Sequence, residues 1–451
     1  TDTGGTVEKT YNITILNSTL NNFKNSTTGY LVLAAVHPIT NTYLETDYVN
    51  LDFSGQGLSP FESANLDDIN LFGLGLPTPV LFSGNISTGS TGDLSARLFD
   101  VYSNGFFENN SYDLTVDTIY NQILAFQSPT NPALKLVVIQ DGSVSDSLKF
   151  YRYNATNRGL TFLAQTGNAD LVATGTLNEW DVDFEQQSGD AIIALYNTTG
   201  TDGVSIISIS NNLTTISSTK ISTKTFGSVS TLQLDVEGRS GSDEVFIFYK
   251  NDSLDTGDFY IKRWNGTGID NSVSFKRDTD PNSEGLKIEE DANRDMNLIY
   301  TDSLSAINKL HFMKYYPNNN SLTGVINFTI GAINVNGELQ RNLKIYSDPT
   351  RADYVHVFLT NTNLRYILFN GTDFSTKFSS SNATTGSAAS WDSVLYSSRT
   401  KFLLVNNFGN VKPTYVTINI SDSAVSAESL ITSSSFLIDD EALKLNYDPT
   451  T

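Results

Sequence analysis

The chain has 451 residues, of which 39% are hydrophobic and 17% are charged, and its formal net charge is −21 at pH 7. This length suits two or three ordinary domains or one large body built from repeats, and the apolar content is ample for a packed core, which excludes global disorder. The acidic surface excludes nucleic acid and anionic lipid as natural partners, because both would be repelled.

The N-terminal region, residues 1–116, is expected to be β-structure. Residues 9–19 alternate like a strand and end in an Asn-Ser-Thr triplet. The longest apolar stretch, 30–36, has the length of a strand and is far shorter than the roughly 18 residues of a membrane span, so we expect no membrane insertion. Residues 43–116 predict one further β-unit, with strands at 79–82 and 96–102.

Residues 117–432 predict six repeats of about 50 residues, each made of four short strands. One repeat is the clearest, with strands at 232–236, 245–249, 259–264 and 273–276. Other first strands are expected at 119–126, 180–184, 286–288, 343–346 and 391–396, and other second strands at 134–139, 191–196, 296–300, 354–359 and 402–405. The second strands are almost continuously apolar, which predicts burial on both faces, as in a strand inside a propeller blade.

The C-terminal segment, residues 433–451, is expected to help close a ring. Residues 436–445 resemble the first two strands of a repeat, and residues 9–19 resemble a third, so both termini could share one blade. The predicted fold is therefore an all-β propeller of eight four-stranded blades. Seven blades with an N-terminal β extension, or with a separate N-terminal β-sandwich, are the alternatives.

Asn-x-Ser/Thr triplets mark the same point of each repeat. The candidate N-glycosylation sites are Asn12, Asn17, Asn25, Asn85, Asn109, Asn154, Asn197, Asn212, Asn251, Asn265, Asn319, Asn327, Asn370, Asn382 and Asn419. Six of them directly follow the predicted third strands: Asn154, Asn212, Asn265, Asn319, Asn370 and Asn419. Their total number is near what chance would give, so the argument for glycosylation depends on their regular position within the repeats.

Two readings of the phased triplets compete. Asn-Gly, as in Asn265-Gly266 and Asn370-Gly371, is a favoured hairpin turn and explains the Asn alone. Turn chemistry is not expected to explain a Ser or Thr two positions later in all six repeats. We therefore expect covalent N-glycans and an extracellular or cell-surface location.

The lack of cysteine and the start of the chain bear on the source. With no cysteine there are no disulfides and no thiol chemistry, which in a surface protein of this size favours an archaeal or other prokaryotic type. The chain begins at Thr1 without Met, as a processed mature form would.

The strings 259–267, Phe-Tyr-Ile-Lys-Arg-Trp-Asn-Gly-Thr, and 364–372, Leu-Arg-Tyr-Ile-Leu-Phe-Asn-Gly-Thr, resemble hairpins of extracellular sialidase-like propeller repeats. The resemblance extends to the spacing of all six repeats, but to the residue sequence of only two. It implies the propeller fold, and in sialidases an arginine cluster, a Tyr–Glu pair and Ser-x-Asp-x-Gly-x-Thr-Trp turns. None of those turns occurs here and no arginine triad can be assigned, so the resemblance implies the fold rather than the activity.

The search for catalytic residues yields none, and we expect no enzyme. The histidines are His37, His311 and His356, and the last two lie in apolar runs typical of hydrogen-bonded structural residues. Phosphate loops, metalloprotease motifs and nucleophile elbows do not occur. Trp180 and Trp391 occupy similar places in their repeats, which favours packing between blades over a sugar-binding shelf.

Acidic residues gather around the turn after each first strand. Carboxylates crowded on one rim could bind calcium, and the candidate ligands are Asp183, Glu185, Asp235, Glu237, Glu289 and Asp291. The competing reading is that Asp and Asn cap tight turns through their own backbone and that the acids repel unwanted strand addition. Two of these carboxylates could also serve a glycosidase, which is the less favoured reading. No other cofactor is expected.

Together these patterns predict a secreted, N-glycosylated structural or adhesive protein, a subunit of a surface layer or an extracellular filament. Its expected partners are other copies of itself or cell-surface glycoproteins. Assembly could use the segment 7–16 as a strand added to the next subunit. The alternative is a carbohydrate-binding or sialidase-like carbohydrate-active propeller.

Overall fold

The computed structural model describes part of the chain, and its residues form strands, turns and bends. The described residues are 30–37, 43–50, 58–62, 66–72, 80–85, 93–102, 105–115, 120–131, 133–141, 147–154, 156–157, 159–166, 180–197, 203–214, 216–220, 234–251, 258–275, 285–304, 307–329, 343–360, 364–380, 389–396, 400–408 and 414–430. Within these ranges there is no helix of the length and apolarity that a bilayer span needs. The all-β fold class is confirmed for the described chain.

The described strands form eight antiparallel sheets. The first two sheets hold β1 (Tyr30–His37), β2 (Tyr43–Asn50) and β3 (Leu58–Glu62), and β4 (Leu66–Phe72), β5 (Val80–Asn85), β6 (Asp93–Tyr102) and β7 (Gly105–Thr115). The next three hold β8 (Tyr120–Gln127), β9 (Leu134–Asp141), β10 (Ser147–Asn154) and β11 (Gly159–Gln165); β12 (Trp180–Phe184), β13 (Ala191–Asn197), β14 (Gly203–Ile209) and β15 (Ile216–Lys220); and β16 (Leu234–Gly238), β17 (Glu244–Asn251), β18 (Asp258–Asn265) and β19 (Ile269–Phe275). The last three hold β20 (Gly285–Glu290), β21 (Met296–Leu304), β22 (Ile307–Tyr316), β23 (Ser321–Leu322) and β24 (Ile326–Thr329); β25 (Leu343–Ser347), β26 (Tyr354–Thr360), β27 (Leu364–Asn370) and β28 (Phe374–Ser379); and β29 (Ala389–Tyr396), β30 (Lys401–Phe408), β31 (Thr414–Asn419) and β32 (Ser429–Leu430).

Each sheet is a meander in which consecutive strands pair as neighbours. The sheet with five strands follows the same plan, because β23 and β24 both pair with β22, at Tyr315–Tyr316 and at Lys309–Phe312 respectively. They are two pieces of one outer strand, interrupted around Gly324. Because the strands alternate in direction, the turns between strands one and two and between strands three and four lie at the same end of each sheet.

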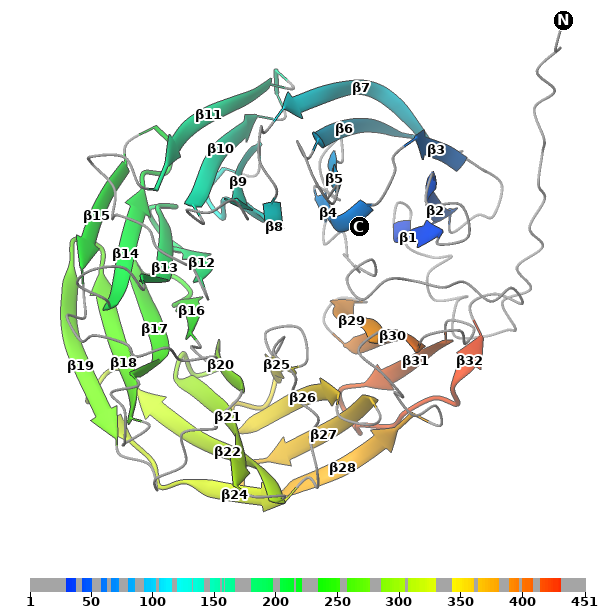
Figure 1. Cartoon of the computed structure of the whole chain (residues 1–451). Coiled ribbons are helices and arrows are strands. Elements are labelled where there is room, and N and C mark those ends of the chain that lie inside the picture. Colours follow the sequence, from blue (N-terminus) through cyan, green and yellow to red (C-terminus); the bar gives the residue numbers. More distant parts are fainter. Residues whose placement is uncertain are drawn as a thin grey trace, which may run out of the picture.

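The sheets stand side by side around a ring, with the first strand of each sheet nearest the middle and the last strand outside (Figure 1). The first strands of neighbouring sheets touch: β12 contacts β16, β16 contacts β20, and β20 contacts β25. This radial array of sequential meanders is the β-propeller architecture.

The core lies between the sheets, and in the six sheets from β8–β11 onward the second strand is a major contributor to it. In β13, Ala191, Ile193 and Leu195 pack with the β8–β11 sheet, whereas Ile192 and Ala194 pack with the β16–β19 sheet. All five are fully buried. The predicted burial of second strands on both faces is therefore confirmed, and the reason is that each sheet is sandwiched between two neighbours.

The two Asn-Gly turns need glycine for its backbone. Gly266 and Gly371 have φ of 88° and 87°, in the left-handed region. A Cβ on Gly371 would lie 3.0 Å from the Cβ of Asp353, and one on Gly266 would lie 3.1 Å from the Cβ of Asp243. Both turns connect the third strand to the fourth, as the sequence predicts.

The N-terminal region differs from the sequence prediction. Residues 43–116 do not form one unit, because β2 pairs with β1 and β3 pairs with β2, while β4–β7 form a separate sheet. The short connection between β1 and β2 favours a local hairpin, which the polar alternation of 43–50 did not reveal. The proposed closing strands, residues 9–19 and 436–445, lie outside the described residues.

The packing between sheets predicts a contrast between two phenylalanines. Phe248 is buried between the β16–β19 and β20–β24 sheets, whereas Phe162 on β11 is 51% exposed. Phe248→Ala should destabilise the protein by about 3 to 5 kcal/mol through lost burial and a residual cavity. Phe162→Ala should cost less than about 0.5 kcal/mol. Urea unfolding followed by tryptophan fluorescence measures both, and equal costs would contradict the packing.

Candidate functional site

The innermost strands carry ionisable side chains at the junctions between neighbouring sheets. In β12, buried and partly exposed residues alternate, so Asp181 and Asp183 lie on one face of the strand. Successive sheets place these pairs at the corresponding positions: Asp181 and Asp183, Asp235 and Glu237, Lys287 and Glu289, Lys344 and Tyr346. We call these residues, with Asp392 on β29, the inner ring.

Carboxylates of the inner ring accept hydrogen bonds from the backbone of the next sheet. Asp181 Oδ2 accepts from the Val236 N–H at 2.9 Å, and Asp183 Oδ2 accepts from the Gly238 N–H at 2.7 Å. Both N–H groups belong to β16, whose inner edge has no further strand beside it. The carboxylates therefore satisfy edge donors that would otherwise be unpaired.

The next junction repeats this arrangement. Asp235 Oδ2 accepts from the Ile288 N–H at 2.7 Å, and Glu237 Oε1 accepts from the Glu290 N–H at 3.2 Å. Lys287 reaches back to Asp235, with 2.5 Å between Nζ and Oδ1. Each sheet thus closes the inner edge of its successor.

The junctions concentrate negative charge, and the pKa values respond. Burial, followed by the charge of Asp235 and a hydrogen bond to its carboxylate, raises the pKa of Asp181 well above its usual range. Burial raises the pKa of Asp183 to about 6, although the N–H bonds of Gly238 and Phe184 oppose the shift. Burial, then Glu289 and Asp183, raise the pKa of Glu237 well above its usual range. This part of the ring therefore favours protonated carboxyls.

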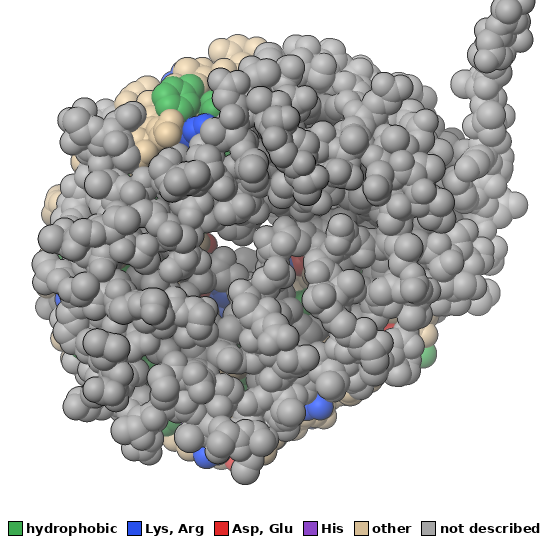
Figure 2. All heavy atoms as spheres, in the orientation of Figure 1, with side chains coloured by type: hydrophobic (Ala, Val, Ile, Leu, Met, Phe, Trp, Pro, Cys, Tyr) green, Lys and Arg blue, Asp and Glu red, His purple; other side chains and the backbone are tan. Residues whose placement is uncertain are grey.

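Further along the inner ring, Lys344 and Tyr346 of β25 take the places of the carboxylates. Lys344 forms an ion pair and hydrogen bond with Asp392 of the next sheet, and the Tyr346 hydroxyl donates to the Ser393 carbonyl at 2.7 Å. Burial alone would lower the pKa of Lys344, but Asp392 outweighs it and raises the pKa. Figure 2 shows an opening near the middle of the ring, with acidic and basic side chains visible inside it.

The six predicted calcium ligands do not converge on one point. Asp183, Asp235, Glu237 and Glu289 belong to the inner ring, where the first three bind backbone N–H groups. Glu185 accepts instead from the Trp264 indole at 2.5 Å, and Asp291 pairs with Lys314 at 2.5 Å while capping its own turn. Among the residues that the structure describes, no group of three or more His, Asp or Glu could hold a metal ion. The geometry thus follows the turn-capping reading for Asp291, which accepts from the N–H groups of Asn293 and Asp295. Glu185 accepts from the Ser188 hydroxyl and the Trp264 indole instead.

A second series of polar contacts joins the sheets further out, on the face that carries the turns between strands one and two. We call these contacts the outer clamps. They are Arg152 to the Asn212 carbonyl (3.4 Å), Glu185 to Trp264 (2.5 Å), Arg239 to the Arg294 carbonyl (3.2 Å) and to Asn318 (3.0 Å), Lys314 to Asp353 (2.8 Å), and Arg351 to the Ile420 carbonyl (2.6 Å). Every junction from the β8–β11 sheet to the β29–β32 sheet has one.

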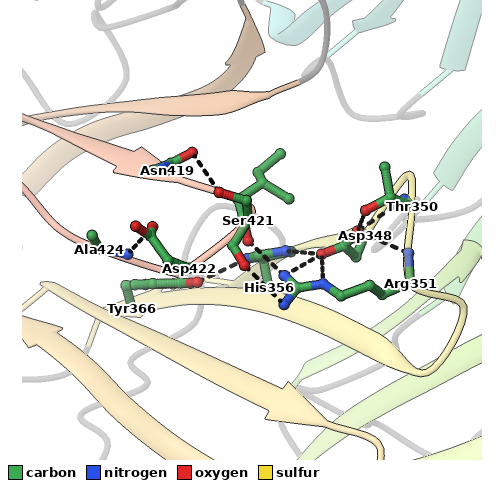
Figure 3. A network of polar contacts seen from close by, with 10 residues as sticks. Asp348, Thr350, Arg351, His356, Tyr366, Asn419, Ser421, Asp422 and Ala424 are labelled. Carbon is green, nitrogen blue, oxygen red and sulfur yellow. Dashed lines mark hydrogen bonds and ion pairs between the residues drawn. The ribbon is translucent and has the colours of Figure 1, made fainter.

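The last clamp is part of a buried network, shown in Figure 3. Asp348 and His356 are fully buried, with 3.3 Å between Oδ2 and Nε2, and His356 Nδ1 lies 2.8 Å from the Tyr366 hydroxyl. Arg351 Nε donates to Asp348 Oδ2 at 2.7 Å. Burial would raise the pKa of Asp348, but the bonds from His356, Arg351 and Thr350 outweigh it and hold the pKa well below its usual range. Burial lowers the pKa of His356.

The predicted structural roles of two histidines and the tryptophans hold. His311 and His356 are both buried and hydrogen-bonded, His311 through Nδ1 to Asn327 Oδ1 at 2.5 Å. Trp180, Trp264 and Trp391 are buried in the packing between sheets. The three indoles therefore offer no sugar-binding shelf. His37 belongs to β1, and its side chain lies outside the described residues.

The six phased asparagines occupy equivalent places, at the turn from the third strand to the fourth. Asn212, Asn265, Asn319 and Asn370 are exposed, whereas Asn154 and Asn419 are half-buried. In every turn the Asn Oδ1 accepts from the residue two positions later: from a backbone N–H at Thr156, Thr214, Thr267 and Thr372, and from a hydroxyl at Thr214, Thr267, Ser321 and Ser421. The four turns closed by the backbone N–H are Asx turns, whereas those at Asn319 and Asn419 are closed by the hydroxyl. The expectation that turn chemistry leaves the Ser or Thr unexplained is wrong for the four turns that use the hydroxyl.

The other candidate glycosylation sites are scattered. Asn327 is exposed on β24. Asn85, Asn197 and Asn251 end β5, β13 and β17, and Asn109 lies within β7; the side chains of these four are outside the described part. Asn12, Asn17, Asn25 and Asn382 lie outside the described residues altogether.

Sequence reasoning missed several residues of the inner ring and the outer clamps, among them Asp181, Lys287, Arg351 and Asp392. A signal for the inner ring was present in the first strands, where Asp-Val-Asp, Asp-Val-Glu and Lys-Ile-Glu recur at matching positions. The arginine contacts had no such signal, because each joins residues about 55 to 80 positions apart.

Comparison with known proteins supports the fold. No protein-family model matches the chain, and no curated protein matches it. Among solved structures, the chain is similar to the BP39L lectin from Burkholderia pseudomallei, with a TM-score of 0.51 and 10% identity over 81% of this chain and 100% of the lectin. The protein is a β-propeller.

Two further structures show that this architecture is shared by dissimilar proteins. The dihydro-heme d1 dehydrogenase NirN has a TM-score of 0.52 and 8% identity, over 94% of this chain and 75% of NirN. Saccharomyces cerevisiae Sqt1 has a TM-score of 0.50 and 10% identity, over 82% of this chain and 86% of Sqt1. A lectin and a dehydrogenase with similar folds mean that the propeller alone does not select an activity.

The raised pKa of Asp183 predicts a pH effect on stability. A carboxyl whose pKa is higher in the folded than in the unfolded protein stabilises the fold below about pH 4, and this contribution is lost as the pH rises through about 6. Asp183→Asn keeps an acceptor for the Gly238 N–H and cannot ionise. At pH 8 it should therefore be more stable than the native protein by roughly 1 to 3 kcal/mol, with the advantage vanishing near pH 4. Thermal unfolding between pH 4 and 8 measures this, with the exposed Asp373→Asn as control; a pH-independent difference would refute it.

The Figure 3 network predicts that two arginine clamps differ in strength. Arg351→Ala leaves the buried Asp348 carboxylate without its guanidinium partner and should cost about 2 to 4 kcal/mol. Arg152→Ala removes a single exposed contact of 3.4 Å and should cost less than about 1 kcal/mol. The loss in Arg351→Ala should shrink as the pH falls, because protonation of Asp348 removes the buried charge that Arg351 neutralises. Chemical denaturation at pH 7 and pH 4.5 tests both statements.

Proposed function

We propose that the protein is a secreted, N-glycosylated propeller with a structural or adhesive role at a cell surface, as a subunit of a surface layer or an extracellular filament. Its partners are other copies of itself or cell-surface glycoproteins. In finer detail we propose eight blades built on a four-strand plan, repeats of the extracellular sialidase-like kind, and an archaeal type of surface protein.

The observation that carries this proposal is the equivalence of the six third-to-fourth-strand turns. All six lie at the same end of their sheets, so they are presented on one face of the ring. In these turns the hydrogen bonds are accepted by Asn Oδ1. The Nδ2 atom, which receives a glycan, takes no part in them. Glycans on this face would leave the opposite face and the rim for contacts with other molecules.

Composition and architecture support the same reading. A charge of −21 keeps such a ring soluble and discourages nonspecific adhesion to polyanions. Without disulfides, rigidity has to come from packing, the inner ring and the outer clamps. A rigid body presenting turns on two faces suits repeated contacts in a lattice or filament.

Glycosylation is tested on the native protein by intact mass and glycopeptide mapping. We expect a mass well above the 49.4 kDa of the chain, with glycans on the exposed Asn212, Asn265, Asn319 and Asn370. Thr267→Ala should remove the glycan from Asn265, whereas Thr267→Ser should retain it. Asn265→Asp is the matched control, because it keeps the turn acceptor without an acceptor amide. An unmodified native mass would refute the proposal.

The second candidate is a carbohydrate-binding propeller, and its support is the likeness of fold to the BP39L lectin. The described tryptophans do not add to that support, because all three are buried. A glycan array probed with calcium and with chelator decides between the two readings. Saturable binding to one glycan, or its turnover, would favour the second candidate.

A further inference from the structure

The outer strand β11 differs from the other outer strands of the ring. It is the last strand of its sheet and pairs on one side with β10. Its sequence, Gly-Leu-Thr-Phe-Leu-Ala-Gln, has neither a charge nor a proline. The other continuous outer strands of five or more described residues have at least one: β3, β7, β15, β19 and β28 contain Pro60 and Glu62, Glu108 and Asp113, Lys220, Asp270, and Lys377 respectively. The interrupted outer strand of β23 and β24 and the two-residue β32 have neither, but they offer shorter unbroken edges than β11.

Charges and prolines on an edge strand prevent unwanted strand pairing, so β11 lacks the protection of its counterparts. It also exposes apolar surface. Phe162, near its centre, is one of two large hydrophobic residues that are exposed in the described chain, and its ring packs edge-on against Tyr151 at 5.4 Å between centroids. Figure 2 shows hydrophobic side chains at the upper rim of the ring, where β11 lies in Figure 1.

We propose that the β11 edge receives the segment 6–16 of a second copy of this chain as an added strand. This inference rests on the proposed function, in that it assumes self-assembly, and it names the surface and the segment responsible. Backbone hydrogen bonds along the edge would supply affinity, and side chains beside Phe162 would supply specificity.

The sequence of 6–16 fits such a strand. Its residues alternate, with the mainly apolar Val7, Lys9, Tyr11, Ile13 and Ile15 on one face and the mainly polar Thr6, Glu8, Thr10, Asn12, Thr14 and Leu16 on the other. One face can therefore cover Phe162 while the other meets solvent. A glycan on Asn12 would project from the solvent face and leave the apolar face free.

The connection is long enough to bridge two molecules. Residues 17–29 separate the segment from β1, and when extended they span about 40 Å. The sheet β4–β7 stands between β1–β3 and β8–β11 within one ring (Figure 1). A neighbouring copy can offer its β11 directly, without the segment having to pass over that sheet.

The experiment measures assembly of the full chain by light scattering, beside variants of the segment and of the edge. Deletion of residues 1–16 and Phe162→Lys should each raise the concentration needed for assembly at least tenfold. Thr376→Lys places the same charge on β28, which already has Lys377, and should leave assembly unchanged. A fluorescent peptide of residues 6–16 should bind the deletion variant, and bind it at least tenfold more weakly when Phe162→Lys is added.

The outcomes separate this inference from the proposed function. Assembly that both changes leave intact would overturn the β11 inference and keep the structural role. A deletion variant that fails to fold would show that the segment completes its own ring. A monomer in which position 11 crosslinks to position 162 of its own chain would show that the segment binds within its own chain. Either result would overturn exchange between copies. A native chain that stays monomeric would overturn self-assembly itself.

Discussion

The inner edge of each sheet is the constraint on which the ring depends. A sheet standing radially leaves the N–H groups of its first strand facing the axis, where no further strand can pair with them. Asp181, Asp183, Asp235 and Glu237 meet those groups across two successive junctions. The bonds therefore satisfy the edge and set the position of each sheet relative to the next, which apolar packing, being non-directional, specifies less well.

This arrangement has an electrostatic cost that the molecule distributes unevenly. Crowding and burial raise the pKa values of Asp181, Asp183 and Glu237, so that part of the ring is most stable in acid. The outer network around Asp348 and His356 has the opposite dependence, because both pKa values are lowered and its contribution is lost as the pH falls. Because the two dependences have opposite signs, they partly offset each other where their pH ranges overlap.

The same topology that orders the core also orders the surface. Turns from the third to the fourth strand recur at one end of every sheet, so a triplet repeated in sequence becomes a pattern on one face. The hydroxyl two residues after Asn closes the turn in four of the six cases, which gives Ser and Thr a structural role there besides any role in glycosylation. The outer edge is protected by charges or proline in its longer strands, with β11 as the exception.

The sequence by itself determined the strand rhythm, the doubly buried second strands and the six turns, because each depends on periodicity or on turn residues within a few positions. Two first strands, β12 and β25, begin at the residues that the pattern predicts. Only the tertiary structure decided that β2 and β3 form a sheet with β1, that Glu185 binds Trp264 rather than a shared metal site, and that Arg351 clamps the next sheet. Those contacts join residues far apart along the chain, and a local pattern does not specify which distant partner a polar side chain will meet when the sheets close into a ring.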